Sequence, residues 1–242
     1  MQYTQSEWFG FKKLEFTFNG RYAVLVCPEK PDASRRWLLK TEYFGAFPNF
    51  EVEMLNRGYH VAHVSSITRW HLNEDTETRA EFCRFLHNEW GLNEKCVPVG
   101  MSCGGMQGVY LASSHPECVS VLYLDAPVMN LLSCPFAVGR SDAPMSEEFV
   151  NAKNMTLSEL LSFRDHPIDR FPALLEHKIP VALVCGDADT TVPYKENGEL
   201  LSKLYRQKGL PLYEVLKPGC DHHPHGLEDN TELIKFIEAY YK

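Results

Sequence analysis

The chain has 242 residues, of which 44% are hydrophobic and 23% charged, and its net charge is −8. This is ordinary globular composition, and a chain of this length buries enough apolar surface to fold without disulfide or metal support. The negative charge argues against nucleic acid and anionic membranes as partners. No apolar run approaches the roughly 18 residues of a membrane span, and no apolar stretch typical of a signal peptide stands near the start.

The eight cysteines follow no pairing pattern, and none forms a Cys-x-x-Cys motif. Five of them lie in or beside apolar segments, where a free cysteine behaves as a small hydrophobe. These five are Cys27, Cys83, Cys96, Cys118 and Cys185. Together with the missing leader, they favour reduced thiols and a cytoplasmic location.

The first third of the chain predicts β-strands. Residues 14–18 alternate between apolar and polar side chains, Asn19-Gly20 is typical of a hairpin turn, and residues 22–26 form a second strand. After a polar loop, Trp37-Leu38-Leu39 is a short apolar run suited to a strand that is buried on both faces.

Strands and helices then alternate, which predicts an α/β protein with a mostly parallel sheet and helices on both faces. Pro98 lies in a strand that should be central, and since proline donates no hydrogen bond to a sheet, we expect incomplete pairing there. The expected helices are 50–57, 74–90, one starting near 103, 198–207 and 231–240, and the expected strands are 59–64, 96–99, 119–124, 181–184 and 212–216.

Residues 127–179 interrupt this alternation. The segment is rich in Pro, Ser, Asp and Met, with one amphipathic piece near 157–163. A segment of this length between two core strands is more typical of a lid or substrate-side insertion than of a second domain. We therefore expect a single domain over residues 1–242, with a lid at about 127–179. This lid and the loop around Trp70-His71 should shape the substrate pocket.

The segment Gly100-Met101-Ser102-Cys103-Gly104 fits the G-x-S-x-G pattern of a nucleophile elbow. An apolar strand precedes it and a helix can start behind it. In that context the serine hydroxyl stands exposed on a sharp turn, and the backbone N–H of Cys103 points at a developing oxyanion. The same pattern also occurs in glycine-rich turns that carry no chemistry.

Two more polar loops follow predicted strands. The first carries Asp187 and Asp189, and Asp189 lies further out, where it can reach a histidine from the next loop. Asp-x-Asp is also common in surface turns. The second loop, between the last strand and the last helix, contains His222, His223 and His225.

Among these histidines, His222 is the first after the Pro218-Gly219 turn. The residue before a proline favours extended backbone, in which successive side chains point to opposite sides. We therefore expect His222 to face the elbow and His223 to face away, with His225 packing the loop or touching substrate. The loop has no supporting cysteine or carboxylate pair, so neither a metal nor another cofactor is expected.

The order Ser102, Asp189, His222, each after a predicted strand, is the order of the α/β-hydrolase triad. The chain resembles the α/β-hydrolase superfamily over nearly its whole length. It looks closest to the serine-esterase and prolyl-oligopeptidase-like branch, including bacterial esterases, through residues 37–48, 186–193 and 218–227. The resemblance implies an eight-stranded core, Ser102 as nucleophile, Asp189 as acid and His222 as base.

One loop departs from the pattern of that superfamily. Many lipases and esterases carry a His-Gly-Gly stretch after the third strand, whereas residues 40–45 here read Lys-Thr-Glu-Tyr-Phe-Gly. The oxyanion hole would then combine the N–H of Cys103 with a backbone N–H near Glu42 or Tyr43.

Taken together, these residues predict a serine hydrolase that cleaves a carboxylic ester through an acyl-enzyme intermediate. Family analogy points to a small acyl or acetylated-sugar substrate. A peptidase or thioesterase with the same residues is the alternative. A non-catalytic binding protein on the same fold is less expected, because such proteins usually lose one triad residue and all three candidates are present here.

Overall fold

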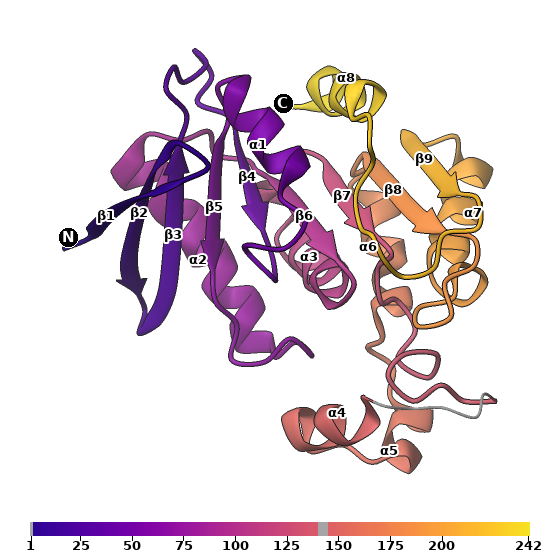
Figure 1. The fold of residues 1–242 in the computed structure, drawn as a ribbon. Coiled ribbons are helices and arrows are strands. Elements are labelled where there is room, and N and C mark those ends of the chain that lie inside the picture. The colour runs from indigo at the N-terminus through magenta and orange to yellow at the C-terminus, as the bar shows by residue number, and fades with distance from the viewer. Residues whose placement is uncertain (1, 140–144) are drawn as a thin grey trace.

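A computed structural model describes residues 2–139 and 145–242. Its centre is a nine-stranded sheet in the order β1-β2-β3-β5-β4-β6-β7-β8-β9 (Figure 1). The strands are β1 (Thr4–Trp8), β2 (Phe11–Phe18), β3 (Arg21–Cys27), β4 (Trp37–Lys40), β5 (His60–Val64), β6 (Val97–Met101), β7 (Leu122–Asp125), β8 (Val181–Gly186) and β9 (Leu212–Lys217). The helices are α1 (Asn49–Asn56), α2 (Asn73–Trp90), α3 (Cys103–Ser114), α4 (Ser146–Lys153), α5 (Leu157–Ser162), α6 (Phe171–Glu176), α7 (Gly198–Lys208) and α8 (Thr231–Tyr240).

The sheet is antiparallel from β1 through β3 to β5 and parallel from β5 to β9. Each element expected from the alternation of strands and helices is present, within a few residues of its predicted ends. The strand count is a correction, because the sheet has nine strands rather than eight. The additional strand, β1, is almost entirely exposed, so its side chains carry no apolar alternation and only its backbone pairing with β2 defines it.

The ladder between β6 and β7 is interrupted at Pro98. Regular pairing starts at Val99 opposite Tyr123, and an isolated bridge joins Cys96 to Val119. Pro98, which has no N–H to donate, falls between these two contacts. The incomplete pairing expected at this position is therefore present, while β6 keeps its other neighbour through the pairing of Pro98 with Leu39 on β4.

Two apolar cores lie on opposite faces of the sheet. Helices α2, α3, α6 and α7 cover one face, and α1 and α8 cover the other (Figure 1). All residues of β5, β6, β7 and β8 are buried because both faces of these strands are covered. This double burial is the reason that these strands appear in the sequence as nearly continuous apolar runs. None of the helices in the described ranges is both long enough and apolar enough to cross a bilayer.

The expected insertion, 127–179, supplies α4, α5 and α6; its residues 140–144 lie outside the described ranges. Helices α4 and α5 stand apart from the sheet, beyond the carboxyl ends of the parallel strands (Figure 1). A third apolar core holds this region to α3. Phe149 of α4 packs edge-on against Trp70 with ring centroids 5.5 Å apart, and Lys153 Nζ donates to the carbonyl of His71 at 2.9 Å.

A buried ion pair fixes the loop that follows β4. Lys40 ends β4 and pairs with Glu51 of α1, and both side chains are at most 1% exposed. Lys40 Nζ also lies 3.4 Å from the carbonyl of Ala46. The pair thus ties the start of the loop at residue 40, its far part at residue 46 and the first turn of α1 into one cluster.

We expect Glu51→Leu to destabilise the protein by roughly 3–5 kcal/mol, because it leaves the Lys40 ammonium buried without its partner. The double variant Lys40→Met/Glu51→Leu should lose much less, since it removes both charges. Urea denaturation of the two variants measures the difference. Equal losses in both would show that the charges are not coupled.

Candidate active site

Ser102 lies on a sharp turn between β6 and α3. Its backbone has φ 52° and ψ −119°, in a region that costs free energy for a residue with a side chain. The glycines around it are required by close packing. A Cβ on Gly100 would lie 2.4 Å from the carbonyl oxygen of Gly104, and one on Gly105 would lie 2.4 Å from Cβ of Pro127. The G-x-S-x-G segment therefore forms the elbow expected of it.

Ser102, His222 and Asp189 form one chain of hydrogen bonds. His222 Nε2 lies 3.1 Å from Ser102 Oγ, and His222 Nδ1 lies 2.8 Å from Asp189 Oδ2. The other oxygen, Asp189 Oδ1, accepts from the amides of Thr191 and Val192 at 2.9 and 2.7 Å. The Asp189 side chain is only 1% exposed, so the carboxylate is held by its own loop and directed at the imidazole.

Asp189 and His222 meet because β8 and β9 are parallel neighbours, so the loops that follow these two strands leave the same edge of the sheet. The two loops are joined by backbone contacts. The amide of Ala188 donates to the carbonyl of Cys220 at 3.1 Å. A Cβ on Gly186 would lie 2.1 Å from that same carbonyl oxygen, so only glycine permits the close approach.

Two more aspartates brace the same pair of loops. Asp221 Oδ1 accepts from the amides of Thr190 and His222, both at 2.8 Å, and these bonds lower the pKa of the Asp221 carboxyl. Asp187, the other acid considered from the sequence, accepts from the amide of Gly219 at 2.6 Å. Asp187 thus holds the turn before the histidines, and the structure places Asp189, not Asp187, against His222.

The other two histidines also face the site, which the sequence did not predict for His223. The ring centroids of His222 and His223 are 5.0 Å apart, and both residues line the same cavity. Because the loop is a series of bends rather than an extended segment, the expected alternation of side chains does not apply. His223 stacks on Phe47 with centroids 5.5 Å apart and an interplanar angle of 13°.

His225 has a buried acidic partner that the sequence analysis missed. Its Nδ1 lies 2.6 Å from Asp125 Oδ1, and the amide of Gly226 donates to Asp125 Oδ2 at 2.6 Å. Asp125 is the last residue of β7, the strand beside β6. Its position at the carboxyl end of a predicted parallel strand was the feature of the sequence that could have identified Asp125 as a site residue. The assumption that no carboxylate supports the histidine loop is therefore wrong.

Cys103, which follows the nucleophile, begins α3 with its backbone N–H at the helix N-terminus. Its side chain is 1% exposed, and burial raises the pKa of the thiol to about 11. The thiol thus stays protonated at neutral pH and is a poor nucleophile. This environment is consistent with a role for Cys103 through its backbone alone.

The loop that contains Glu42 and Tyr43 packs against the elbow. Thr41 Oγ1 donates to the carbonyl of Gly104 at 2.7 Å. Tyr43 has a positive φ of 54° and lines the cavity with Ser102. The side chain of Glu42 accepts a hydrogen bond from Ser66. Both amides considered for the oxyanion hole therefore lie on a loop held at the nucleophile turn.

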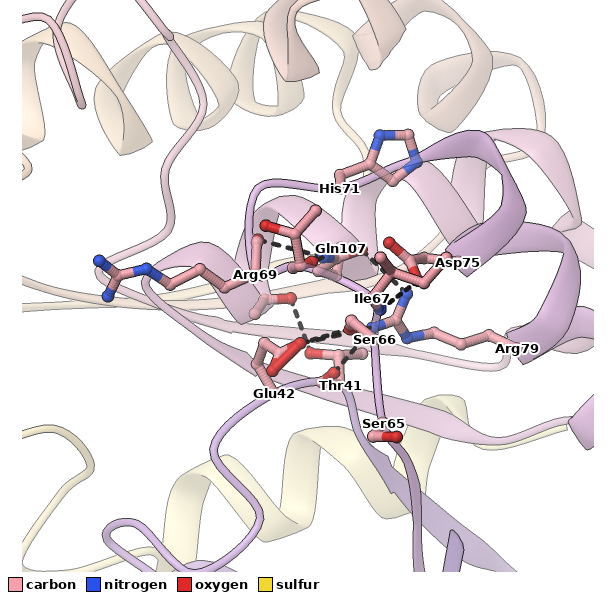
Figure 2. Close-up of polar contacts among 12 residues, drawn as sticks. Thr41, Glu42, Ser65, Ser66, Ile67, Arg69, His71, Asp75, Arg79 and Gln107 are labelled. Atoms are coloured by element: carbon pink, nitrogen blue, oxygen red, sulfur yellow. Dashed lines mark hydrogen bonds and ion pairs between the residues drawn. The ribbon is translucent and has the colours of Figure 1, made fainter. Parts of the chain in front are cut away.

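A buried polar network anchors this loop to α2 and α3 (Figure 2). Arg79 of α2 donates to Gln107 Oε1 at 2.9 Å, to the carbonyl of Thr41 at 3.0 Å and to Ser66 Oγ at 2.5 Å. Arg79 is 1% exposed, and burial lowers the pKa of its guanidinium. Gln107 of α3 in turn donates to the carbonyl of Arg69 at 3.1 Å. The network therefore links the loops after β4 and β5 to the helix that starts at the nucleophile.

Asp75, at the start of α2, fixes both ends of the loop after β5. It accepts from the amide of Ile67 at 2.8 Å (Figure 2). It also accepts from the amide of Leu72 at 3.0 Å and forms an ion pair with Arg21. Arg69, between these two anchors, pairs with Glu148 of α4. The loop after β5 and the first helix of the insertion are thus connected beside the site.

Ser102 and His222 line a cavity of about 370 Å³. The insertion contributes Met145 and the loop around Trp70-His71 contributes Arg69, so both expected segments reach the cavity, while Trp70 itself lies in the third core. No local pattern in the sequence marks these wall positions individually. The lining residues are Tyr43, Ala46, Phe47, Arg69, Met101, Ser102, Met145, Thr191, His222, His223 and His225.

The sequence pattern of the prolyl oligopeptidase family matches residues 73–242, a range that includes Ser102, Asp189 and His222. The chain is 29% identical over 129 residues to the acylamino-acid-releasing enzyme of Rattus norvegicus. The matched region covers 51% of this chain and 17% of the rat enzyme. It therefore spans less than a fifth of the length of that relative.

Solved structures show the same fold. Dipeptidyl peptidase 4 of Porphyromonas gingivalis superposes with a TM-score of 0.69 at 16% identity, over 95% of this chain and 35% of that one. A puromycin hydrolase mutant complexed with PGG superposes with a TM-score of 0.70 at 18% identity, over 93% of this chain and 37% of that one. The α/β-hydrolase fold expected from the sequence is confirmed.

We expect Ser102→Ala to abolish covalent labelling by a fluorophosphonate probe, because the hydroxyl that attacks phosphorus is removed. Cys103→Ala should be labelled at nearly the wild-type rate, since its backbone N–H is retained. In-gel fluorescence measures both variants, with circular dichroism as the folding control. The reverse pattern, with labelling lost only in Cys103→Ala, would indicate a thiol enzyme.

We also expect His222→Ala to slow fluorophosphonate labelling by at least about 10³-fold, because the members of such a hydrogen-bonded chain act as a unit. His223→Ala should slow it far less, since within the described residues it is His222, and not His223, that hydrogen-bonds to Ser102 and Asp189. The labelling rate against probe concentration measures both. Loss of labelling in His223→Ala, together with normal labelling of His222→Ala, would show that His223 and not His222 is the base.

Proposed function

The chain belongs to the prolyl oligopeptidase family of serine hydrolases, and from this we propose that it is a serine peptidase that cleaves amide bonds in small peptides or acylated amino acids. The observation that carries the proposal is the hydrogen-bonded chain from Ser102 Oγ through His222 to Asp189, with distances of 3.1 and 2.8 Å. The names of its relatives, an acylamino-acid-releasing enzyme, a dipeptidyl peptidase and a puromycin hydrolase, support an amide substrate.

The reaction begins when Ser102 Oγ attacks the substrate carbonyl carbon while His222 Nε2 takes the hydroxyl proton. The carbonyl oxygen becomes an oxyanion, which accepts hydrogen bonds from the N–H of Cys103 and from an amide at Glu42 or Tyr43. The C–N bond then breaks as His222 returns the proton to the leaving amine, and the acyl group remains on Ser102. Water, deprotonated by His222, releases the acid and regenerates the serine.

The fixed position of Asp189 favours amide cleavage. An amine is a poor leaving group unless it is protonated, so the imidazolium of His222 must be stable and correctly oriented when the C–N bond breaks. Asp189 supplies both conditions, because its carboxylate is buried, accepts two backbone N–H bonds and faces His222 Nδ1. An ester or thioester leaving group requires less of this assistance.

Carboxylic ester hydrolysis, the first expectation from the sequence, is the alternative, because the same residues perform it. The cavity of about 370 Å³ is near the lower end of the usual size of ligand sites. Apolar walls at Ala46, Phe47 and Met101 suit a small acyl group, whether the bond that is cleaved is an amide or an ester.

A matched set of substrates separates the two reactions. We expect the protein to hydrolyse the p-nitroanilides of acetyl-alanine and of dipeptides, and Ser102→Ala to lower kcat by roughly 10⁴–10⁶-fold. The corresponding methyl ester and thioester, with the same acyl group, serve as comparison substrates. Ser102-dependent cleavage of the ester or thioester without any cleavage of the anilides would replace the peptidase proposal by an esterase or thioesterase. A folded protein that hydrolyses none of these substrates and does not react with the fluorophosphonate probe would be a binding protein.

A further inference from the structure

The three histidines after β9 form a compact cluster at the cavity wall. The ring centroids of His222, His223 and His225 are 4.9 to 5.0 Å apart in all three pairs, and the rings meet edge to face. Each residue has one ring nitrogen available as a ligand, and these three nitrogens all lie within 4.8 Å of one another. Hydrolysis by the proposed mechanism uses His222 alone, so the arrangement of the other two calls for a separate explanation.

Two of the three imidazoles are oriented by buried carboxylates. Asp189 Oδ2 lies 2.8 Å from Nδ1 of His222, and Asp125 Oδ1 lies 2.6 Å from Nδ1 of His225. The two aspartate side chains are 1% and 2% exposed. A carboxylate on one imidazole nitrogen is the usual partner of a metal-binding histidine, because it fixes the tautomer and makes the other nitrogen a better ligand. In both residues Nε2 is the nitrogen left for a ligand.

The spacing is close to that of a metal site. Nitrogens bound to tetrahedral zinc at about 2.0–2.1 Å lie roughly 3.4 Å apart. The ring nitrogens now lie within 4.8 Å of one another, so metal binding would draw the three rings closer together. We expect His223 to make the largest adjustment, since within the described residues its ring contacts Phe47 and the neighbouring imidazoles and has no carboxylate partner like those of His222 and His225. Imidazole is a favoured ligand of Zn²⁺ and other late divalent transition metals.

We propose that His222, His223 and His225 form an inhibitory site for a divalent transition metal such as Zn²⁺. The metal would take the Nε2 lone pair of His222, which otherwise accepts the proton of Ser102 at 3.1 Å. Metal binding and nucleophile activation therefore exclude each other. This site does not supply a cofactor, because the proposed reaction needs no metal. The inhibition rests on the proposed function, whereas the binding does not.

Binding is tested with the catalytically silent variant Ser102→Ala and Zn²⁺ alone, by isothermal titration calorimetry. We expect one high-affinity ion per chain. Adding His223→Ala to this variant should weaken the affinity at least about 10-fold, the loss typical when support of a metal site is removed. The matched control is His177→Ala, an exposed histidine that precedes β8 at the opposite edge of the sheet. Cys220→Ser, which removes a half-buried thiol of the same loop, is the second control.

Inhibition is tested with the unmodified protein and its best substrate. Zn²⁺ should inhibit with a constant at or somewhat above the calorimetric Kd, because Ser102 competes with the metal for His222 Nε2 in the unmodified protein. EDTA should restore full activity. Absence of Zn²⁺ binding to Ser102→Ala, or equal affinity with and without His223, overturns the site. Binding that depends on His223 but leaves hydrolysis unaffected overturns the inhibitory role. If no substrate is hydrolysed, the calorimetry still decides the site, so failure of the proposed function and failure of this inference are distinguished.

Discussion

The hydrogen bond between His222 Nδ1 and Asp189 Oδ2 is the interaction on which the arrangement of the site depends. It joins two loops that follow adjacent parallel strands, and it directs the imidazole at Ser102. Neither residue is held by this bond alone. Asp189 accepts two amides of its own loop, and Asp221 accepts the amide of His222 together with that of Thr190. Each partner is thus oriented before they meet, which is the preorganisation that acyl transfer requires.

Besides orienting His222, buried charged side chains around the site hold loops that have no regular secondary structure. Arg79 and Asp75 together anchor the loops after β4 and β5, and the pair Lys40–Glu51 also anchors the loop after β4. A charge removed from water is costly unless it is well paired, so these groups permit few alternative loop conformations. The cavity walls are therefore positioned by ionic and polar contacts as well as by the apolar packing of the third core.

Much of the fold followed from local patterns. Each predicted helix and strand corresponds to an observed one, because doubly covered strands and amphipathic helices leave strong periodic signals in the sequence. The exposed strand β1 left none, so the strand count was one too low. The missing N–H of Pro98 correctly predicted an interrupted ladder beside β6. The alternation of side chains expected at His222 and His223 was wrong, because the loop bends and both rings line the same cavity.

The sequence by itself determined the fold class, the nucleophile turn and the order of Ser102, Asp189 and His222, because these features depend on short segments and on the rule that parallel strands end at one edge. Only the tertiary structure decided which side chains meet. Asp125 and His225 are 100 residues apart in the chain and lie 2.6 Å apart in space, and Arg79 reaches the loop of Thr41 from 38 residues away. Such contacts depend on side-chain directions and loop paths that long-range packing selects, and a local pattern of residue types does not contain them.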